Sequence, residues 1–592
     1  MTKPDKLKIR PKDAATIAIA TAAIWLLVLI SDPSIVGLKS FGLILILTTV
    51  VHLGSSVIWK LEDILAKAAK SRISIFLVGA AGFAIVASLC VFGKFPQPDS
   101  HDEFSYLLAA DTYAHGRLTN LTHPMWVHFE TFHVIQTPSY ASKYPPAQGI
   151  ILAIGQLLSN DMIGVWLSTA LLCAALFWML KQWIPPKWAL VGAAVACLHP
   201  ELLYWGHGFW GGQLAMTGGC MLLGSFKRAL SSATLRDGLI AGIGCALMAN
   251  TRPFEGALLT IIVACSLLFS IKVRKISQPR QDWLRLAAAY AAVLVLTGFF
   301  IAFYNHRVTG NWHTLPYMVH EIQYEPIPLF WWQKMRPIPH FNHPEFYDMR
   351  LISDKRAYDL AQSFPLAMLW AKVKAYLHWY LLSFDLPILL LVSLPLLLKR
   401  DFYMRLAVAI ILFFYIGPFA ETWANGSHYF APAAGLFFLV PLQAMRHWRV
   451  WRWKGLRPGL PLMRAVVIIT FLLLANSFRT GIQELRGKQS NWSYQRADLI
   501  QSLERQGGQH LVVVHYLPGH SPVQQWIYNG ADIDNSPVVW AHDMGVEKNK
   551  ELLDYFKDRH VWLLTLGPAS GSFVPYTEAA EASLPPREKA PN

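Results

Sequence analysis

The chain has 592 residues, of which 54% are hydrophobic and only 15% are charged, and its formal net charge is +15. A soluble domain carries about a quarter charged residues, so this composition excludes an ordinary soluble enzyme. The positive charge lies in short clusters between apolar segments. That placement argues against nucleic acid as a partner and marks loops on the cytoplasmic side of a membrane.

Apolar segments long enough to cross a hydrocarbon core of about 30 Å recur along the chain. They predict an all-α polytopic membrane protein with about 13 transmembrane helices, two of them forming a hairpin at Arg252-Pro253. This count places every basic cluster and the N-terminus in the cytoplasm, and we expect a bacterial inner or plasma membrane. The predicted spans are 15–31, 41–59, 73–92, 161–180, 188–205, 209–226, 238–250, 253–271, 284–304, 377–398, 403–420, 429–445 and 462–478.

The chain divides by composition into a membrane part and a C-terminal part. In the latter, helical patterns alternate with the strand-like runs "LVVVHY", "VVW" and "HVWLLTL", which is typical of a small α/β domain, here on the extracytoplasmic side. The predicted regions are 1–72, a cytoplasmic tail with two extra transmembrane helices; 73–478, the transmembrane core with outer loops 93–148 and 305–376; 479–577, the α/β domain; and 578–592, a disordered tail.

The first outer loop contains "DSHDEFSY", which places Asp102 and Glu103 side by side at the start of a short helix on the membrane surface. Acids favour a helix N-terminus because of its dipole, so capping alone is an alternative explanation for one of them. A carboxylate beside low-dielectric surroundings is also how a general base for a hydroxyl group is built. A second surface helix is expected near Pro145 and Pro146.

Two basic residues are candidates for binding an anionic group such as a phosphodiester. Lys143 lies just before the second surface helix, and Arg252 lies inside an otherwise apolar hairpin, where a charge is usually functional. Both have a structural alternative. Arg252 can pair with Glu255 three residues on, and Lys143 can be an interfacial lysine that reaches the headgroups.

Other polar residues lie at the predicted outer ends of spans. Glu201 is in a tight turn, where it either lines the same cavity or belongs to simple helix-end chemistry. No cofactor is required by these residues. The histidines of the first outer loop nevertheless allow a divalent metal, with His101 and Glu103 as the candidate ligands, although no short ligand spacing recurs on one helix face.

The run "HDEFSYLLAADTYAHGRLTN" and the later "SKYPPAQG" resemble the first outer loop of the GT-C glycosyltransferases. The similarity is to the branch that holds the protein O-mannosyltransferases and the lipid A aminoarabinose transferases, glycosyltransferase family 39. "NGSHYFAPAAG" also resembles an Arg-Tyr segment of that family, with His in place of Arg. The residues that carry the resemblance are Asp102, Glu103, Tyr106, Gly116, Lys143, Pro145, Pro146, His428 and Tyr429.

The resemblance implies that Asp102 is the base that activates the acceptor, with Glu103 orienting the acceptor or tuning Asp102. It also implies an inverting transfer from a sugar on a polyprenyl phosphate. Tyr106, His428 and Tyr429 are then candidate substrate contacts. The sequence departs from the aminoarabinose transferases before the Pro-Pro pair, where Ser142-Lys143-Tyr144 lacks their acid.

The sequence therefore predicts an integral membrane glycosyltransferase whose acceptor is a glycan, a lipid or a protein hydroxyl. Two alternatives stay open. A transporter or flippase for a lipid-linked glycan or another solute would place ionisable residues near the bilayer midplane. A glycan polymerase or ligase would use a dominant outer loop, for which 305–376 is long enough.

Overall fold

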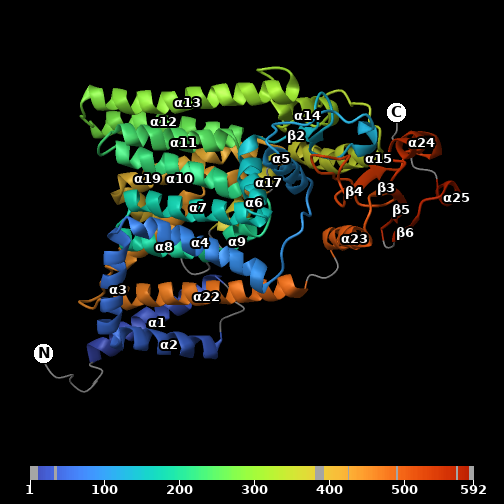
Figure 1. Ribbon diagram of the computed structural model, residues 1–592. Helices are drawn as coiled ribbons and strands as arrows, with labels where there is room; N and C mark the ends of the chain where they lie inside the picture. Colours follow the sequence, from blue (N-terminus) through green and yellow to red (C-terminus); the bar gives the residue numbers. More distant parts are fainter. Residues whose placement is uncertain are drawn as a thin grey trace.

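The computed structural model describes residues 11–31, 37–380, 393–423, 426–487, 491–568 and 571–585. Long helices run side by side through one part of the molecule, and helix α3 (Ser55–Lys70) lies across one end of them (Figure 1). The C-terminal sheet lies beyond the opposite end, with the outer loops between it and the long helices.

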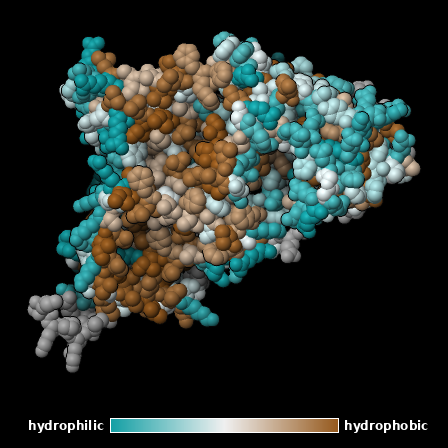
Figure 2. Space-filling view, viewed as in Figure 1, coloured by the Kyte–Doolittle hydropathy of each residue, from teal (hydrophilic) through white to brown (hydrophobic). Residues whose placement is uncertain are grey.

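Six described helices are long and apolar enough to cross a membrane, or up to eight if each of two bent pairs is one span. Apolar residues cover much of this helical part on the face seen in Figure 2. The protein is therefore an integral membrane protein. The predicted count of about 13 crossings is not confirmed. The six helices are α4 (Ile73–Phe92), α7 (Asp161–Trp183), α12 (Pro253–Arg274), α13 (Arg280–Thr309), α19 with α20 (Phe402–Ala420) and α22 (Gly459–Gly487).

Several predicted spans are shorter helices or interrupted ones. Helix α11 has 15 residues, which corresponds to a length of only about 22 Å. The span predicted at 377–398 falls largely on residues outside the described part of the chain. The remaining helices of this part are α1 (Pro11–Ser31), α2 (Leu38–Leu53), α8 (Pro186–Leu198), α9 (Pro200–Gly206), α10 (Gly212–Ala229), α11 (Leu235–Ala249), α18 (Leu394–Arg400), η6 (Ser427–Ala433) and α21 (Gly435–Trp448).

The second predicted span, 41–59, ends earlier than expected. The chain bends by 75° between α2 and α3. Helix α3 is amphipathic and carries Glu62 among several lysines, so it lies across the bundle instead of continuing through it. Glu62 accepts hydrogen bonds from Arg449 at 2.5 Å and Arg464 at 2.8 Å, which fixes α3 to the helix ends.

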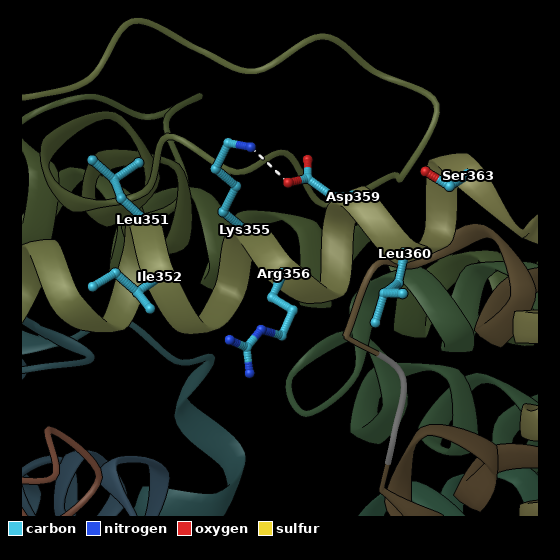
Figure 3. Close-up of a pocket in the computed structure, with 7 residues that line it drawn as sticks. All are labelled: Leu351, Ile352, Lys355, Arg356, Asp359, Leu360 and Ser363. Atoms are coloured by element: carbon cyan, nitrogen blue, oxygen red, sulfur yellow. Dashed lines mark hydrogen bonds and ion pairs between the residues drawn. The ribbon is translucent and has the colours of Figure 1, made fainter.

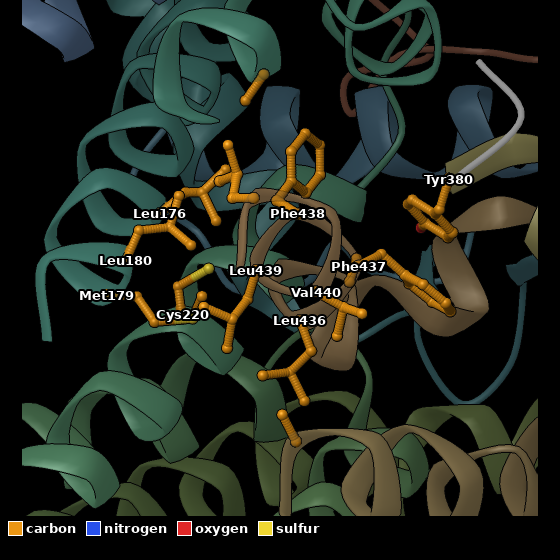
Figure 4. Packing of buried hydrophobic residues seen from close by; sticks show 14 of the residues in the cluster. Leu176, Met179, Leu180, Cys220, Tyr380, Leu436, Phe437, Phe438, Leu439 and Val440 are labelled. Atoms are coloured by element: carbon orange, nitrogen blue, oxygen red, sulfur yellow. The ribbon is translucent and has the colours of Figure 1, made fainter. Parts of the chain in front are cut away.

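The centre of the helical part is a single apolar core built around α7, α10, η6 and α21 (Figure 4). Close approach at the centre depends on Gly219 of α10. A Cβ atom there would overlap the carbonyl oxygen of Pro432 in η6. This contact fixes η6, and with it the neighbouring His428 and Tyr429, against the core.

Both outer loops are ordered and contain short helices. The helix predicted after Asp102 is present, and the second surface helix begins at Pro146, as the proline pair predicts. The elements of these loops are α5 (His101–Ala114), η2 (Trp126–Phe129), β1 (Val134–Ile135), β2 (Ala141–Ser142), α6 (Pro146–Leu157), α14 (Pro316–Tyr324), α15 (Pro344–Tyr347), the π-helix η3 (Asp348–Asp354), α16 (Lys355–Ser363) and α17 (Pro365–Tyr380).

The C-terminal region is a small mixed α/β sheet, as its alternating pattern predicts. The strand order is β4-β3-β5-β6; β3 is parallel to β4 and β5, and β6 is antiparallel to β5. Alternate residues of β3 face opposite layers, with Val512 against the side of α23 and Val513 against the side of α24. The elements are α23 (Trp492–Gln506), β3 (His510–Tyr516), β4 (Val538–His542), α24 (Val546–Tyr555), β5 (His560–Leu566), β6 (Gly571–Pro575) and α25 (Glu578–Ala582).

The predicted disorder of 578–592 is wrong for its first part. Helix α25 follows β6, and the buried carboxylate of Glu581 accepts hydrogen bonds from Asn549 at 3.0 Å and from the hydroxyl of Tyr576. These two hydrogen bonds hold the segment on the sheet domain. Residues 586–592 lie outside the described part of the chain.

Candidate active site

The N-terminus of α5 positions the two adjacent acids. Ser100 caps this helix, its hydroxyl accepting a hydrogen bond from the backbone N–H of Glu103 at 3.4 Å. Negative charge in the first turn is favoured by the helix dipole. The two side chains make different contacts. Asp102 contacts the β1–β2 hairpin, and Glu103 contacts the turn before α10.

The β1–β2 hairpin holds His133 and Tyr144 next to Asp102. The hydroxyl of Ser105, in the same helix as Asp102, donates to the carbonyl of His133 at 2.6 Å and lies 2.7 Å from the hydroxyl of Ser142. His133 has a φ of 62°, in the left-handed region that non-glycine residues rarely occupy. The hydrogen bond from Ser105 helps to keep it there.

One oxygen of Asp102 is anchored and the other is open. Oδ1 accepts a hydrogen bond from the hydroxyl of Tyr144 and lies 3.1 Å from Nδ1 of His133. Within the described ranges no residue donates a hydrogen bond to Oδ2, and 27% of the side chain is exposed. A hydroxyl group can therefore approach Oδ2, which is the geometry that a general base requires.

The surroundings keep Asp102 ionised. Burial raises its pKa, but the His133 ring, the Tyr144 hydroxyl and the positive charge of Lys143 outweigh burial and hold this pKa below its usual range. Burial and the charge of Lys143 lower the pKa of His133 to about 3, so that ring is neutral and contributes a hydrogen bond.

Lys143 is buried without a close carboxylate. Only 5% of it is exposed, and its Nζ lies 5.3 Å and 5.1 Å from the ring centres of Tyr144 and Tyr317. No carboxylate oxygen of a described residue lies within 4.0 Å of this Nζ. Burial and the positive charge of Arg350 lower the pKa of Lys143 to about 8. An anion bound here would stabilise the ammonium form.

Arg252 lies at the start of α12, close to α6, because the backbone N–H of Ala147 donates to the carbonyl of Asn250 at 3.0 Å. Its guanidinium is 3.7 Å from Oε1 of Glu255 and 4.7 Å from the ring centre of Tyr429. A charge-assisted hydrogen bond is about 2.7–2.9 Å long, so the pairing with Glu255 is loose and leaves the N–H groups available.

Tyrosines join the acid to this arginine. Burial raises the pKa values of Tyr106 and Tyr429. The positive charge of Arg252 lowers both pKa values and the negative charge of Asp102 raises both, so each hydroxyl interacts electrostatically with both charged groups. The Tyr106 ring stacks on Tyr144 at 4.6 Å. The structure thus brings together six of the residues selected from sequence, namely Asp102, Tyr106, Lys143, Arg252, Tyr429 and His428, whose ring lies 4.7 Å from that of Tyr429.

Glu103 makes its contacts elsewhere. Its Oε1 accepts a hydrogen bond from the backbone N–H of Phe209 at 2.7 Å, and its Oε2 accepts one from that of Asp99 at 3.0 Å. Burial and the charge of Asp99 raise the pKa of Glu103 to about 8. These contacts hold the first outer loop against the turn before α10.

Glu201 reaches the cluster through Ser427. The hydroxyl of Ser427 donates to Oε1 of Glu201 and accepts from the indole N–H of Trp205 at 2.9 Å, which orients the segment that carries His428. His101 contacts the C-terminal region, with its Nε2 3.1 Å from the carbonyl oxygen of Pro522.

The predicted metal ligands His101 and Glu103 belong to no group of three or more close ligand side chains within the described chain. Such a group exists elsewhere and consists of His343, Glu345 and His542. All three are buried, and one ligand atom from each lies within 4.8 Å of the others. This group could bind a metal ion.

The sheet domain covers the first outer loop. The ring of Phe104 stacks on that of Tyr528, with the centres 4.0 Å apart. The guanidinium of Arg496 lies 5.1 Å from the centre of the Phe104 ring. The backbone N–H of Ala531 donates to Oδ2 of Asp111 at 2.6 Å. The helix that carries Asp102 is therefore held from both sides, by the hairpin and by the C-terminal domain.

A separate open pocket of about 420 Å³ lies along η3 and α16 (Figure 3). Lys355 and Asp359 form a 2.6 Å ion pair on its wall. It shares no lining residue with the Asp102 cluster, and no residue selected from sequence lines it. Its lining consists of Leu351, Ile352, Lys355, Arg356, Asp359, Leu360 and Ser363.

Sequence reasoning did not select Tyr144 or Tyr317 as site residues, and it included His133 only among the loop histidines that allow a metal. Tyr144 follows Lys143 directly, and that adjacency was the available signal. His133 and Tyr317 have no local signal, because a hairpin and a separate outer loop bring them to Asp102 and Lys143.

No protein-family model and no curated protein match the sequence. The chain is similar to solved structures of an oligosaccharyltransferase and of ArnT. An oligosaccharyltransferase of Archaeoglobus fulgidus, in complex with zinc and sulfate, has 13% identity over 82% of this chain and 67% of its own, with a TM-score of 0.46. ArnT of Cupriavidus metallidurans, bound to undecaprenyl phosphate, has 10% identity over 84% of this chain and 93% of its own, with a TM-score of 0.43.

Proposed function

We propose that the protein is an integral membrane glycosyltransferase that transfers a sugar from a polyprenyl phosphate to an extracytoplasmic acceptor hydroxyl, with inversion. The observation that supports it most is the environment of Asp102. Oδ1 is held by Tyr144 and His133 while Oδ2 is open, and the buried Lys143 and the half-buried Arg252 lie in the same cluster without a close hydrogen-bonded anion. The N-terminus is then cytoplasmic, and the sheet domain extracytoplasmic.

In the proposed reaction Oδ2 of Asp102 accepts the proton of the acceptor hydroxyl. The acceptor oxygen attacks the anomeric carbon from the face opposite the phosphate, the new carbon–oxygen bond forms, and the bond to the phosphate oxygen breaks. The bonding electrons leave with the polyprenyl phosphate. Attack from the opposite face accounts for inversion, and positioning by Tyr144 and His133 limits the motion of the base.

The leaving phosphate gains negative charge as that bond breaks. Lys143 and Arg252 are placed to stabilise this charge, and they do so strongly because water is largely excluded around them. The loose contact between Arg252 and Glu255 favours this role over a purely structural ion pair. Tyr106, Tyr429 and His428 would contact the sugar, and Glu201 would position His428 through Ser427.

The test is donor cleavage by purified full-length protein in lipid nanodiscs. A panel of polyprenyl-phosphate hexoses and pentoses is supplied with a glycan and glycolipid extract as acceptor, and released polyprenyl phosphate is measured by mass spectrometry. We expect release by the wild type and a loss of at least about 100-fold in Asp102→Asn, because general-base catalysis contributes roughly 10²–10⁴. Asp532→Asn, an exposed acid of the sheet domain, is the matched control.

The other candidate functions predict different products. A transporter or flippase would move the lipid-linked sugar across liposomes without releasing polyprenyl phosphate. A polymerase or ligase would transfer whole glycans from the carrier instead of single sugars. Normal transfer by Asp102→Asn would remove Asp102 as the base while leaving sugar transfer itself in place.

A further inference from the structure

We propose that His343, Glu345 and His542 form a zinc-binding site that joins the second outer loop to the C-terminal sheet. His343 and Glu345 flank Pro344 at the start of α15, and His542 is the last residue of β4. One ligand atom from each residue lies within 4.8 Å of the others. This proposal is independent of sugar transfer.

Hydrogen bonding prepares both histidines as ligands. Nε2 of His343 lies 2.7 Å from the carbonyl oxygen of Val127, and Nε2 of His542 lies 2.9 Å from that of Glu130. A carbonyl oxygen only accepts, so Nε2 carries the proton in each ring and Nδ1 keeps its lone pair. Metal-bound histidines commonly donate their other N–H to a carbonyl oxygen in this way, which fixes the tautomer and the orientation of the ring.

Binding of one ion by both rings requires a change in their relative placement. The rings of His343 and His542 are stacked, with centres 3.7 Å apart and planes at 15°, so one ring must turn before both in-plane lone pairs point at the same ion. Both side chains are fully buried, and Glu345 is 7% exposed. Ligand atoms around a tetrahedral zinc ion are about 3.3 Å apart, so turning one ring and drawing together atoms that now lie within 4.8 Å would close the site, with a water as the fourth ligand.

The donor set favours zinc over calcium or magnesium. Two imidazoles and one carboxylate match borderline-soft divalent ions, whereas calcium and magnesium take oxygen ligands almost exclusively. The carboxylate offsets part of the ionic charge inside a buried site.

The site would connect three distant parts of the chain. The second outer loop and β4 supply the ligands, and the first outer loop supplies the carbonyl groups of Val127 and Glu130 that orient them. A bound ion would therefore fix the sheet domain over the loop that carries Asp102. Because metal binding contributes to folding free energy, removing the ion should loosen these contacts.

The experiment uses full-length protein without an affinity tag, stripped with a chelator and titrated separately with Zn²⁺ and with Co²⁺. We expect one zinc per chain and a tetrahedral Co²⁺ absorption spectrum. His542→Gln and Glu345→Gln should each weaken binding by at least about tenfold. His560→Gln, at the exposed start of β5, should keep full binding.

Hydrogen exchange provides a readout that does not depend on the variants. Chelation should increase exchange in 340–347 and 538–543 together in the wild type. The proposal is wrong if the wild type binds no zinc, if His542→Gln binds it as tightly as the wild type, or if chelation leaves both segments equally protected.

Discussion

Nδ1 of His133 lies 3.1 Å from Oδ1 of Asp102, and the hydroxyl of Tyr144 donates to that same oxygen. Two groups from one hairpin thus stabilise the ionised form of a largely enclosed carboxylate. Their interactions outweigh burial and hold the pKa of Asp102 below its usual range. The same geometry leaves Oδ2 outside the network.

We expect Tyr144→Phe and His133→Asn each to raise the pKa of Asp102 toward its ordinary value. Asn tolerates the left-handed φ of 62° at this position, so the hairpin is kept. A lowered pKa keeps the carboxylate ionised as pH falls, so losing a stabilising group moves the acid limb of kcat/KM to higher pH. The acid limb should move by one pH unit for about every 1.4 kcal/mol of interaction energy that is lost. Acid limbs that coincide with the wild type in both variants would contradict this account.

Lys143 gives a prediction on the alkaline side. Its pKa of about 8 means that the ammonium loses its proton as pH rises through this value, so KM for the lipid donor should increase above it. Lys143→Arg should flatten this increase, because a guanidinium stays charged. Lys143→Met should raise KM by about 10–100-fold near pH 7, the loss expected for a hydrogen bond to a charged group. The exposed Lys355→Met is the control, and an equal effect there would exclude a local role for Lys143.

Arg252 and Glu255 should respond differently to substitution if Arg252 binds the donor. Arg252→Lys loses the planar set of donors and should lower kcat/KM by about tenfold or more. Glu255→Gln removes only the negative charge that lies 3.7 Å from Arg252, and donor binding should be as tight as in the wild type or tighter. Donor titrations and thermal unfolding of both variants separate the two roles. Equal losses of stability with equal losses of binding would identify a structural ion pair instead.

Local chemistry explains which features could be predicted from sequence. The strands β3, β4 and β5 were predictable because each is a short run rich in valine, leucine and aromatic residues, and α6 because Pro145 and Pro146 mark its start. Asp102 and Lys143 were recognisable from composition and neighbours. His133 was not, since only the left-handed backbone and the hairpin bring it to Asp102. The group of His343, Glu345 and His542 combines positions about 200 residues apart and has no local spacing to detect. The count of about 13 spans is not confirmed, and hydropathy alone does not distinguish a short helix such as α11 from a crossing.

Glu103 is expected to act on stability more than on chemistry. In Glu103→Gln the amide oxygen can accept only one of the two backbone hydrogen bonds, from Asp99 or from Phe209. The other backbone N–H then faces the NH₂ group of the new amide, which is itself a donor. A lost buried partner costs about 1–3 kcal/mol, which thermal unfolding in detergent will show. Residual activity per folded molecule should stay within about tenfold of the wild type. A loss of activity as large as that of Asp102→Asn, without a fall in stability, would instead place Glu103 in the chemistry.

The contact between Gly219 and Pro432 predicts that a single methyl group disturbs the site from the apolar core. In Gly219→Ala the new Cβ overlaps the carbonyl oxygen of Pro432, and backbone atoms on both sides leave no flexible group to move aside. Overpacking of this kind costs about 1–3 kcal/mol, so the midpoint of thermal unfolding should fall. Because η6 also carries His428 and Tyr429, KM for the donor should rise in the folded fraction. The matched control is Gly298→Ala on α13, where a Cβ meets nothing within 4 Å and the substitution should be neutral or stabilising by up to about 1 kcal/mol. Equal midpoints of thermal unfolding for the two variants would show that the contact with Gly219 does not hold η6 in place.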